Sequence, residues 1–284
     1  YDISYEYGEL AVDPLPITVI TESHTFVYNG LAQYWDGHTV SPETPLVEGH
    51  RTNVLTYTEI VNVWDGPIPN LLTVAILNGN DEDMTANYDI SYEYGELVIL
   101  PRPVTVITGS MEWVYDGAPH SFGEYRVSDE TPLVTGHITK LLSLTEIENV
   151  WDGPADNVVS VTVRGTDGED LSENYEISYK YGLLTVTPRP ITVISEDHDW
   201  VYDGDAHSWN GHALSDETPL VEGHRTEAVA LTEIVNVRDG SAETPADNEI
   251  LVTVLASDGE DMTANYDISY VCGGLAVIPK PITV

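Results

Sequence analysis

Aspartates two or three positions apart recur in three similar turns, and their carboxylates are the groups in this chain best suited to holding a metal. The pairs are Asp81 and Asp83, Asp167 and Asp170, and Asp258 and Asp261. Calcium prefers several hard oxygen ligands, which closely spaced carboxylates on a turn supply. The spacing does not match a helix-loop-helix calcium motif, however, and clustered charges ordinarily face water. We therefore expect solvated turns and no cofactor, with calcium as the alternative.

Two tryptophans form the second group with chemical potential. Trp64 and Trp151 occupy equivalent positions, and each is followed by an aspartate, Asp65 or Asp152. A flat aromatic face is a platform for a sugar ring, and the neighbouring carboxylate accepts hydrogen bonds. The third equivalent position holds Arg238, which predicts an exposed site. We take Trp64 and Trp151 as candidate ligand-binding residues, with a contact between neighbouring repeats as the alternative.

Three histidines, His50, His137 and His224, each follow a glycine. An imidazole titrates near neutrality and binds metals, but no second histidine or cysteine recurs at a ligand spacing. We therefore expect each histidine to hydrogen-bond the backbone of a turn. The carboxylate pair of Glu146 and Glu148 is not repeated in the other copies. Because no nucleophile, base or metal triad recurs, we expect no enzymatic activity and no catalytic residues.

These residues recur because the chain itself repeats. Four Pro-x-Pro segments, at residues 14–16, 101–103, 188–190 and 279–281, punctuate it with a period of about 90 residues. Two fixed φ angles within three residues make a stiff, extended connector. The chain divides there into residues 1–14, the last strand of a preceding repeat; 15–101, repeat 1; 102–188, repeat 2; 189–279, repeat 3; and 280–284, the first strand of a following repeat.

Within each repeat the hydrophobic period is two. Residues 175–181 alternate apolar and polar side chains, as a half-buried strand must. Further strands are predicted at residues 191–194, 200–202, 226–235 and 250–255. At Gly95, Gly182 and Gly273 the alternation changes phase, which predicts a β-bulge. No segment keeps a helical period. We expect an all-β chain, a tandem array of three immunoglobulin-like β-sandwich modules; β-grasp-like modules are the alternative, but they need a helix.

Charge and composition limit the partners. The formal net charge is −38 and 42% of the residues are hydrophobic, so the chain is acidic and able to form cores. Such a surface repels nucleic-acid phosphates and acidic membranes, and no apolar stretch approaches the about 20 residues of a membrane-spanning helix. We expect neither nucleic-acid binding nor membrane insertion. The one cysteine, Cys272, stands where other copies have tyrosine, which favours a buried apolar role.

Four motifs stand in a fixed order in repeat 3: residues 201–204 (Val-Tyr-Asp-Gly), 219–224, 258–268 and 274–279. This set resembles the tandem YDG- or MBG-type repeats of large bacterial cell-surface proteins. The resemblance covers nearly the whole chain. It implies an extracellular, adhesin-like protein on the bacterial cell surface, built from all-β modules, and it brings no known catalytic residue or ligand with it.

These expectations lead to a structural function. We expect stalk or spacer repeats of a bacterial extracellular adhesin or surface fibre, which project a binding region from the cell. A strand of about ten residues spans roughly 33 Å, so three modules predict a rod on the order of 100 Å or more. The expected partners are neighbouring repeats of the same long chain. The alternative is a set of multivalent modules that bind glycans or host surface proteins, because repetition multiplies a weak affinity.

Overall fold

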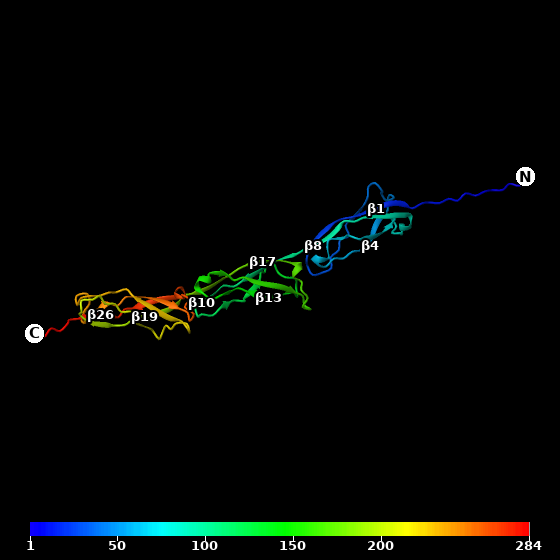
Figure 1. Cartoon of the computed structure of the whole chain (residues 1–284). Helices are drawn as coiled ribbons and strands as arrows, with labels where there is room; N and C mark the ends of the chain where they lie inside the picture. The colour runs from blue at the N-terminus through cyan, green and yellow to red at the C-terminus, as the bar shows by residue number, and fades with distance from the viewer. Residues whose placement is uncertain (284) are drawn as a thin grey trace. The chain divides into compact units, whose positions relative to one another are not determined.

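The structure, a computed structural model, describes residues 1–283. Over these residues the regular elements are β-strands and single 3-10 turns, with no α-helix (Figure 1). Alternate strand residues are buried, as in β1, where Ile17, Val19 and Thr21 point into the core. The predicted all-β architecture of sandwich-like modules is therefore confirmed. The helix that a β-grasp module needs is absent from this part of the chain.

Repeat 1 contains eight strands and two 3-10 turns. They are β1 (Leu15–Thr21), β2 (His24–Val27), β3 (His38–Val40), β4 (Arg51–Tyr57), η1 (Val63–Asp65), β5 (Ile68–Pro69), β6 (Leu72–Leu77), η2 (Thr85–Asn87), β7 (Tyr88–Glu93) and β8 (Glu96–Leu100).

Repeats 2 and 3 follow the same order. Repeat 2 has β9 (Arg102–Thr108), β10 (Met111–Val114), β11 (His120–Ser121), β12 (Tyr125–Val127), β13 (Ile138–Leu144), β14 (Glu146–Ile147), η3 (Val150–Asp152), β15 (Ala155–Asp156), β16 (Val159–Arg164), η4 (Ser172–Asn174), β17 (Tyr175–Lys180) and β18 (Leu183–Thr187). Repeat 3 has β19 (Arg189–Ser195), β20 (His198–Val201), β21 (His212–Leu214), β22 (Arg225–Ala230), β23 (Ala246–Asp247), β24 (Ile250–Leu255), η5 (Thr263–Asn265), β25 (Tyr266–Val271) and β26 (Gly274–Ile278).

Each repeat forms two three-stranded sheets and a two-stranded sheet, and repeat 2 has a further two-stranded sheet of β11 and β14. In repeat 1 the strand orders are β3-β1-β7, β2-β8-β5 and β4-β6, and the equivalent sheets recur in repeats 2 and 3. The first strand of a repeat pairs in parallel with its last but one, with Ile17 opposite Ile90 in β1 and β7. The second strand pairs in parallel with the last, as β2 does with β8. Parallel pairing of strands this far apart in sequence closes the repeat on itself.

The phase change at Gly95 and its equivalents is not a β-bulge, and that prediction is wrong. Strand β7 belongs to the sheet of β1, whereas β8, two residues later, belongs to the sheet of β2. The chain passes from one sheet to the other at Gly95, where an added Cβ would lie 2.4 Å from the Ser23 backbone nitrogen. Glycine is required there because two backbone segments touch.

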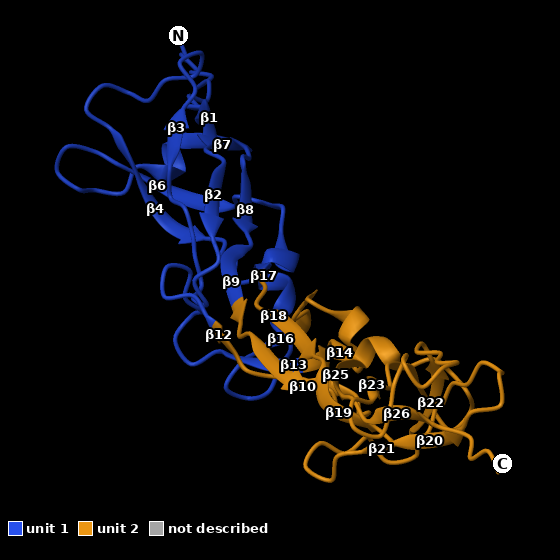
Figure 2. Ribbon diagram, turned by 90° about the vertical axis from the view of Figure 1, so that its left-hand side faces the viewer, with its two compact units in different colours: residues 1–106, 127–141, 161–179 blue, residues 107–126, 142–160, 180–284 orange. Residues whose placement is uncertain are grey.

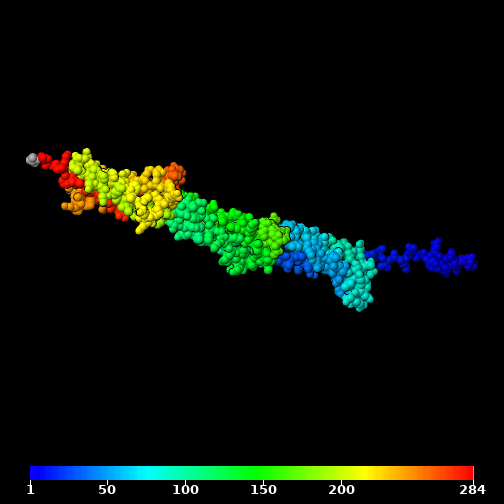
Figure 3. Space-filling model, turned by 90° about the horizontal axis from the view of Figure 1, so that it is seen from below, coloured from blue at the N-terminus to red at the C-terminus, as the bar shows by residue number. Residues whose placement is uncertain are grey.

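Three further segments lack part or all of the strand that the sequence predicted for them. The strand predicted at residues 226–235 ends earlier, since β22 ends at Ala230. Residues 1–14 (dark blue in Figure 3) and 280–283 are exposed and carry no strand. Their assignment to adjoining repeats stays a prediction, and Val284 lies outside the described residues.

The compact units of the chain do not coincide with its sequence repeats. Unit 1 comprises residues 1–106, 127–141 and 161–179, and unit 2 comprises residues 107–126, 142–160 and 180–284 (Figure 2). Each unit therefore contains the boundary between two folded repeats, at residues 101–103 in unit 1 and at residues 188–190 in unit 2. In unit 1 a single hydrophobic cluster contains Tyr28 and Leu97 of repeat 1 together with Val104 and Tyr175 of repeat 2. The core thus continues across the boundary that the prolines mark in the sequence.

Candidate functional site

The tryptophans singled out in the sequence lie beside these boundaries. Trp64 and Trp151 occupy the middle of the 3-10 turns η1 and η3, and their side chains are 44% and 49% exposed. The following aspartates are structural: Asp152 Oδ2 accepts the N–H of Asn149 at 2.7 Å and closes its turn. Asp65 makes the same contact with its own turn. Both tryptophans are therefore accessible and held on a rigid support.

The same turns reach across the repeat boundary through an asparagine of the next repeat. In unit 1 the Val63 N–H donates to Asn174 Oδ1 at 2.8 Å, and Asn174 Nδ2 donates to Asn62 Oδ1 at 3.0 Å. In unit 2 the equivalent distances, from Val150 and to Asn149, are 2.8 and 2.9 Å, and the asparagine is Asn265. Asn174 and Asn265 are fully buried. We call these two arrangements the joint of unit 1 and the joint of unit 2.

Aromatic rings fill the centre of each joint. Tyr28 packs edge-on against Tyr175 with ring centroids 5.5 Å apart, and Tyr115 packs against Tyr266 at 5.6 Å. Only 2% of Tyr28 and 1% of Tyr115 is exposed. Edge-to-face packing of buried rings adds to the stabilisation from the area that they remove from water. Each joint therefore contains a buried, specific contact between two repeats.

Each repeated histidine bonds a tyrosine of its own repeat, and His50 does so with Tyr88 at 2.7 Å. His137 and His224 also lie beside the joint tyrosines Tyr28 and Tyr115, with ring centroids 6.1 Å apart. His137 Nδ1 lies 2.7 Å from the hydroxyl oxygen of Tyr175, and His224 Nδ1 lies 2.7 Å from that of Tyr266. Our expectation of a bond to the backbone is thus wrong, because the tyrosine hydroxyl is interposed and itself accepts a backbone N–H, that of Val134 in unit 1. The tautomer of the histidine determines which of the two groups donates in this bond. Burial lowers the pKa of both imidazoles, which favours the neutral form.

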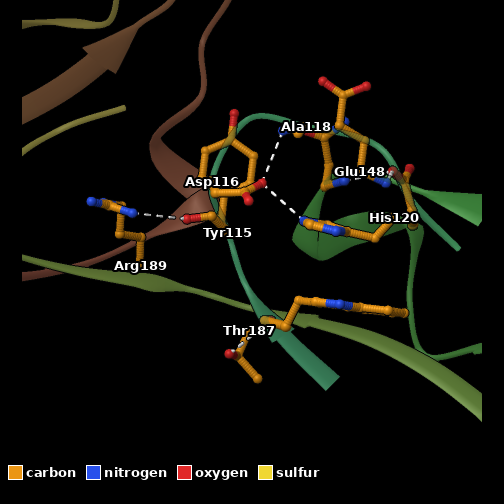
Figure 4. Close-up of polar contacts among 10 residues, drawn as sticks. Tyr115, Asp116, Ala118, His120, Glu148, Thr187 and Arg189 are labelled. Carbon is orange, nitrogen blue, oxygen red and sulfur yellow. Dashed lines mark hydrogen bonds and ion pairs between the residues drawn. The ribbon is translucent and has the colours of Figure 1, made fainter. Parts of the chain in front are cut away.

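Figure 4 shows the surroundings of Tyr115 in the joint of unit 2. The Asp116 carboxylate accepts hydrogen bonds from the Ala118 N–H at 3.0 Å and from His120 Nε2 at 2.9 Å. Partial burial alone would raise the pKa of Asp116, but these bonds outweigh it and lower the pKa. The Arg189 guanidinium donates to the Tyr115 carbonyl at 3.4 Å. The turn at residues 116–117, where Gly117 has a φ of 77°, therefore fixes the backbone of the joint tyrosine.

The hydroxyl of Tyr115 is held in its neutral form. Burial raises its pKa to about 12, and the neighbouring Tyr266 hydroxyl and Glu148 carboxylate add to the shift. A hydrogen bond with the Asn265 side chain works in the opposite direction. Tyr115 therefore acts in the joint as an uncharged packing and hydrogen-bonding residue, not as an acid or base.

The aspartates proposed as calcium ligands mostly bond their own turns. Asp83, Asp170 and Asp261 each accept the N–H of the residue two positions later, and these bonds lower their pKa values. Asp167 and Asp258 do the same. Asp81 instead pairs with Arg51. Over residues 1–283 no three histidine, cysteine or acidic side chains are grouped to hold a metal.

Cys272 is exposed, so the predicted buried role is wrong. It follows the last core positions of β25 at the sheet-to-sheet crossing, and the tyrosines at the equivalent positions, Tyr94 and Tyr181, are exposed as well. Within the described residues no helix is long and apolar enough to span a membrane.

Comparison with known proteins assigns no family to the chain. No family model matches it, and no curated protein does. Among solved structures, the match with N-cadherin EC1-3 of Drosophila covers 92% of this chain and 98% of the N-cadherin chain, at 9% identity and a TM-score of 0.24. A second match is with SGBP-B of a Bacteroides ovatus mixed-linkage glucan utilization locus, which was solved with a heptasaccharide. It covers 90% of this chain and 67% of the SGBP-B chain, at 9% identity and a TM-score of 0.14. Similarity this low assigns neither a function nor a ligand.

The joints were missed in the sequence. Their buried asparagines stand in Asn-Tyr pairs at residues 174–175 and 265–266, and the partner turns carry Asn-Val at residues 62–63 and 149–150. Both pairs recur at the repeat period. A polar residue repeated beside a core tyrosine was the available signal, since burial is the usual reason to retain an amide at such a position.

Proposed function

We propose that these repeats are non-catalytic structural modules of an extracellular bacterial surface protein, and that they hold a binding region away from the cell. The observation that carries this proposal is the joint. Two successive boundaries are crossed by hydrogen bonds of equivalent asparagines, at distances that agree within 0.1 Å. A chain that conserves the geometry of its connections, but no reactive group, is organised for positioning.

The surfaces at the outer edges of repeats 1 and 3 fit the same purpose. Tyr202, the counterpart of Tyr28 and Tyr115, is 39% exposed and lines an open pocket of about 610 Å³ with Asn236 and Val237. These two residues are the counterparts of the Asn-Val pairs in the joints. In repeat 1, Asn87, the counterpart of Asn174, is exposed. We propose that neighbouring repeats of the same kind cover both surfaces.

The proposal requires adjoining repeats to move together. Amide ¹⁵N relaxation of the whole chain is expected to give the same rotational correlation time on the two sides of the unit 2 joint, in β18 and in β19. In the Asn265→Ala variant the correlation times of the two sides are expected to differ. Independent tumbling in the unmodified protein would overturn a positioning function.

A multivalent binding function is the second candidate, and the exposure of Trp64 and Trp151 favours it. The full chain is to be tested against immobilised glycans and host matrix proteins, with calcium and with a chelator. A specific partner lost in the Trp64→Ala, Trp151→Ala double variant, at an unchanged melting temperature, would establish binding modules. No binding in either condition is the outcome expected for spacers. The cadherin and glucan-binding structures do not decide between the two.

A further inference from the structure

An open pocket of about 630 Å³ lies at the joint of unit 2, and its lining comes from both repeats. Trp151 of repeat 2 forms one side, and Glu260, Asp261, Thr263 and Ala264 of repeat 3 form the other. The tryptophan is 49% exposed and its turn is fixed by Asp152. The pocket therefore combines an accessible aromatic face with two carboxylates.

Both carboxylates are available to a cation. Asp261 uses Oδ1 to accept the Thr263 N–H at 2.9 Å, and its lowered pKa keeps it ionised. The nearby Arg225 is engaged elsewhere, since it donates to the Ala256 carbonyl at 3.0 Å and to Glu227 at 3.3 Å. Within residues 1–283 no lysine or arginine forms an ion pair with either carboxylate of the pocket.

At the equivalent turn in unit 1 the aspartate pairs with a guanidinium of its own repeat. There Asp170 pairs with the guanidinium of Arg164 at 3.3 Å. Residues 164 and 170 face each other in an isolated β-bridge, and the matching bridge in repeat 3 joins Leu255 to Asp261. Repeat 3 thus keeps the carboxylate but has a leucine where unit 1 has its arginine. The carboxylate of Asp261 therefore has no arginine of its own repeat opposite it.

We propose that the pocket at the joint of unit 2 binds an arginine side chain from a basic segment of a partner protein. The guanidinium stacks on Trp151, whose ring face attracts cations, and donates to the carboxylates of Asp261 and Glu260. A planar, donor-only group matches an aromatic wall beside two acceptors better than a neutral sugar does. The net charge of −38 draws a basic segment toward the chain. Because unit 1 supplies its own arginine, the site is expected at Trp151 and not at Trp64.

The test uses the indole N–H signals of the six tryptophans in the whole chain. The probe is an acetylated and amidated Gly-Arg-Gly peptide, titrated at fixed ionic strength. A saturable shift confined to Trp151 is expected. The matched peptide has citrulline in place of arginine, which keeps the shape and removes the charge. It is expected to bind about fivefold more weakly, or more weakly still.

The decisive variant is Leu255→Arg, which copies the arginine of unit 1 into repeat 3. Repeat 2 carries arginine at the equivalent position, so the fold is expected to persist, and the melting temperature checks this. The variant is expected to lose the arginine-dependent shift of Trp151. An unchanged shift in Leu255→Arg, an equal response to the citrulline peptide, or an equal shift of Trp64 would each overturn the proposal. A shift of Trp151 caused by a neutral oligosaccharide and not by the arginine peptide would replace it with a sugar site.

Discussion

At the scale of single residues, the buried joint asparagines combine complete burial with hydrogen bonds between two repeats. Asn265 bonds the Val150 N–H, the Asn149 side chain and the Tyr115 hydroxyl, and it is fully buried. Removing it leaves buried donors without partners, which costs far more than the loss of a solvated hydrogen bond. The side chain that connects two repeats is therefore also one that the fold cannot easily replace.

We expect Asn265→Ala to lower the free energy of unfolding by about 1–3 kcal/mol. The matched control is Asn87→Ala, because Asn87 holds the equivalent position but is exposed and bonds only Met84. The control is expected to change stability by less than about 0.5 kcal/mol. Urea unfolding measures both. Equal effects of the two substitutions would show that the joint contributes nothing to stability.

The joint histidines give stability a defined pH dependence. Burial lowers the folded-state pKa of His137 and His224, so the unfolded chain binds their protons more readily. The contribution of each histidine is therefore complete above its unfolded pKa of about 6.5 and is lost as the pH falls below that value. We expect the urea midpoint to decrease between pH 7.5 and pH 5.5.

Carboxylates act over a different pH range. The carboxylates with lowered pKa values, such as Asp116 and Asp261, contribute stability that is lost only at more acidic pH. The His137→Gln, His224→Gln double variant is expected to show a smaller decrease over the same range. A decrease of undiminished size in the double variant would assign the effect to other groups.

At the scale of elements, the crossing between sheets depends on a glycine. An added Cβ at Gly182 would lie 2.3 Å from the Gly109 carbonyl oxygen and 2.7 Å from the Ser110 nitrogen, which are backbone atoms that cannot rotate away. We expect Gly182→Ala to lower the free energy of unfolding by about 2–4 kcal/mol. Gly8→Ala is the control, since nothing lies within 4 Å of its added Cβ. Thermal unfolding of both variants provides the measurement, and a neutral Gly182→Ala would show that the crossing is not tightly packed.

The sequence predicted the elements better than their partners. The alternation at residues 175–181 marks β17 because it depends only on which face is buried, which is local information. The phase change at Gly95 was visible, but its meaning was not, because a bulge and a crossing between sheets give the same local pattern. The parallel pairing of β1 with β7 joins residues more than 70 positions apart, as in the bond between Thr18 and Ser91. No local pattern specifies such a partner.

The candidate site was predicted in part. Trp64 and Trp151 are exposed, as the arginine at the third equivalent position indicated. Their position beside the joints matches the alternative of a contact region between repeats. The second half of the pocket was not predicted, because Glu260 and Asp261 come from the following repeat and lie next to Trp151 only when the two repeats are packed together.

At the scale of the whole molecule, charge dominates. The chain has a net charge of −38 with only 10 lysines and arginines, so folding brings like charges together. Salt shortens the screening length from about 10 Å at 0.1 M to about 3 Å at 1 M. We expect the urea midpoint to rise between these concentrations of sodium chloride. A midpoint that falls or does not change would mean that local ion pairs, such as that of Arg164 with Asp170, outweigh the general repulsion.

The offset between sequence repeats and compact units has a consequence for how such a chain changes length. Each segment from one Pro-x-Pro to the next contains both halves of a joint. One half is the Asn-Tyr pair, and the other is the joint tyrosine with its Asn-Val turn. Duplication or loss of one such segment in a gene leaves every remaining half facing its complement. Copy number can therefore vary between related genes without the selection of any new contact, and unequal recombination is structurally neutral wherever it cuts at the prolines.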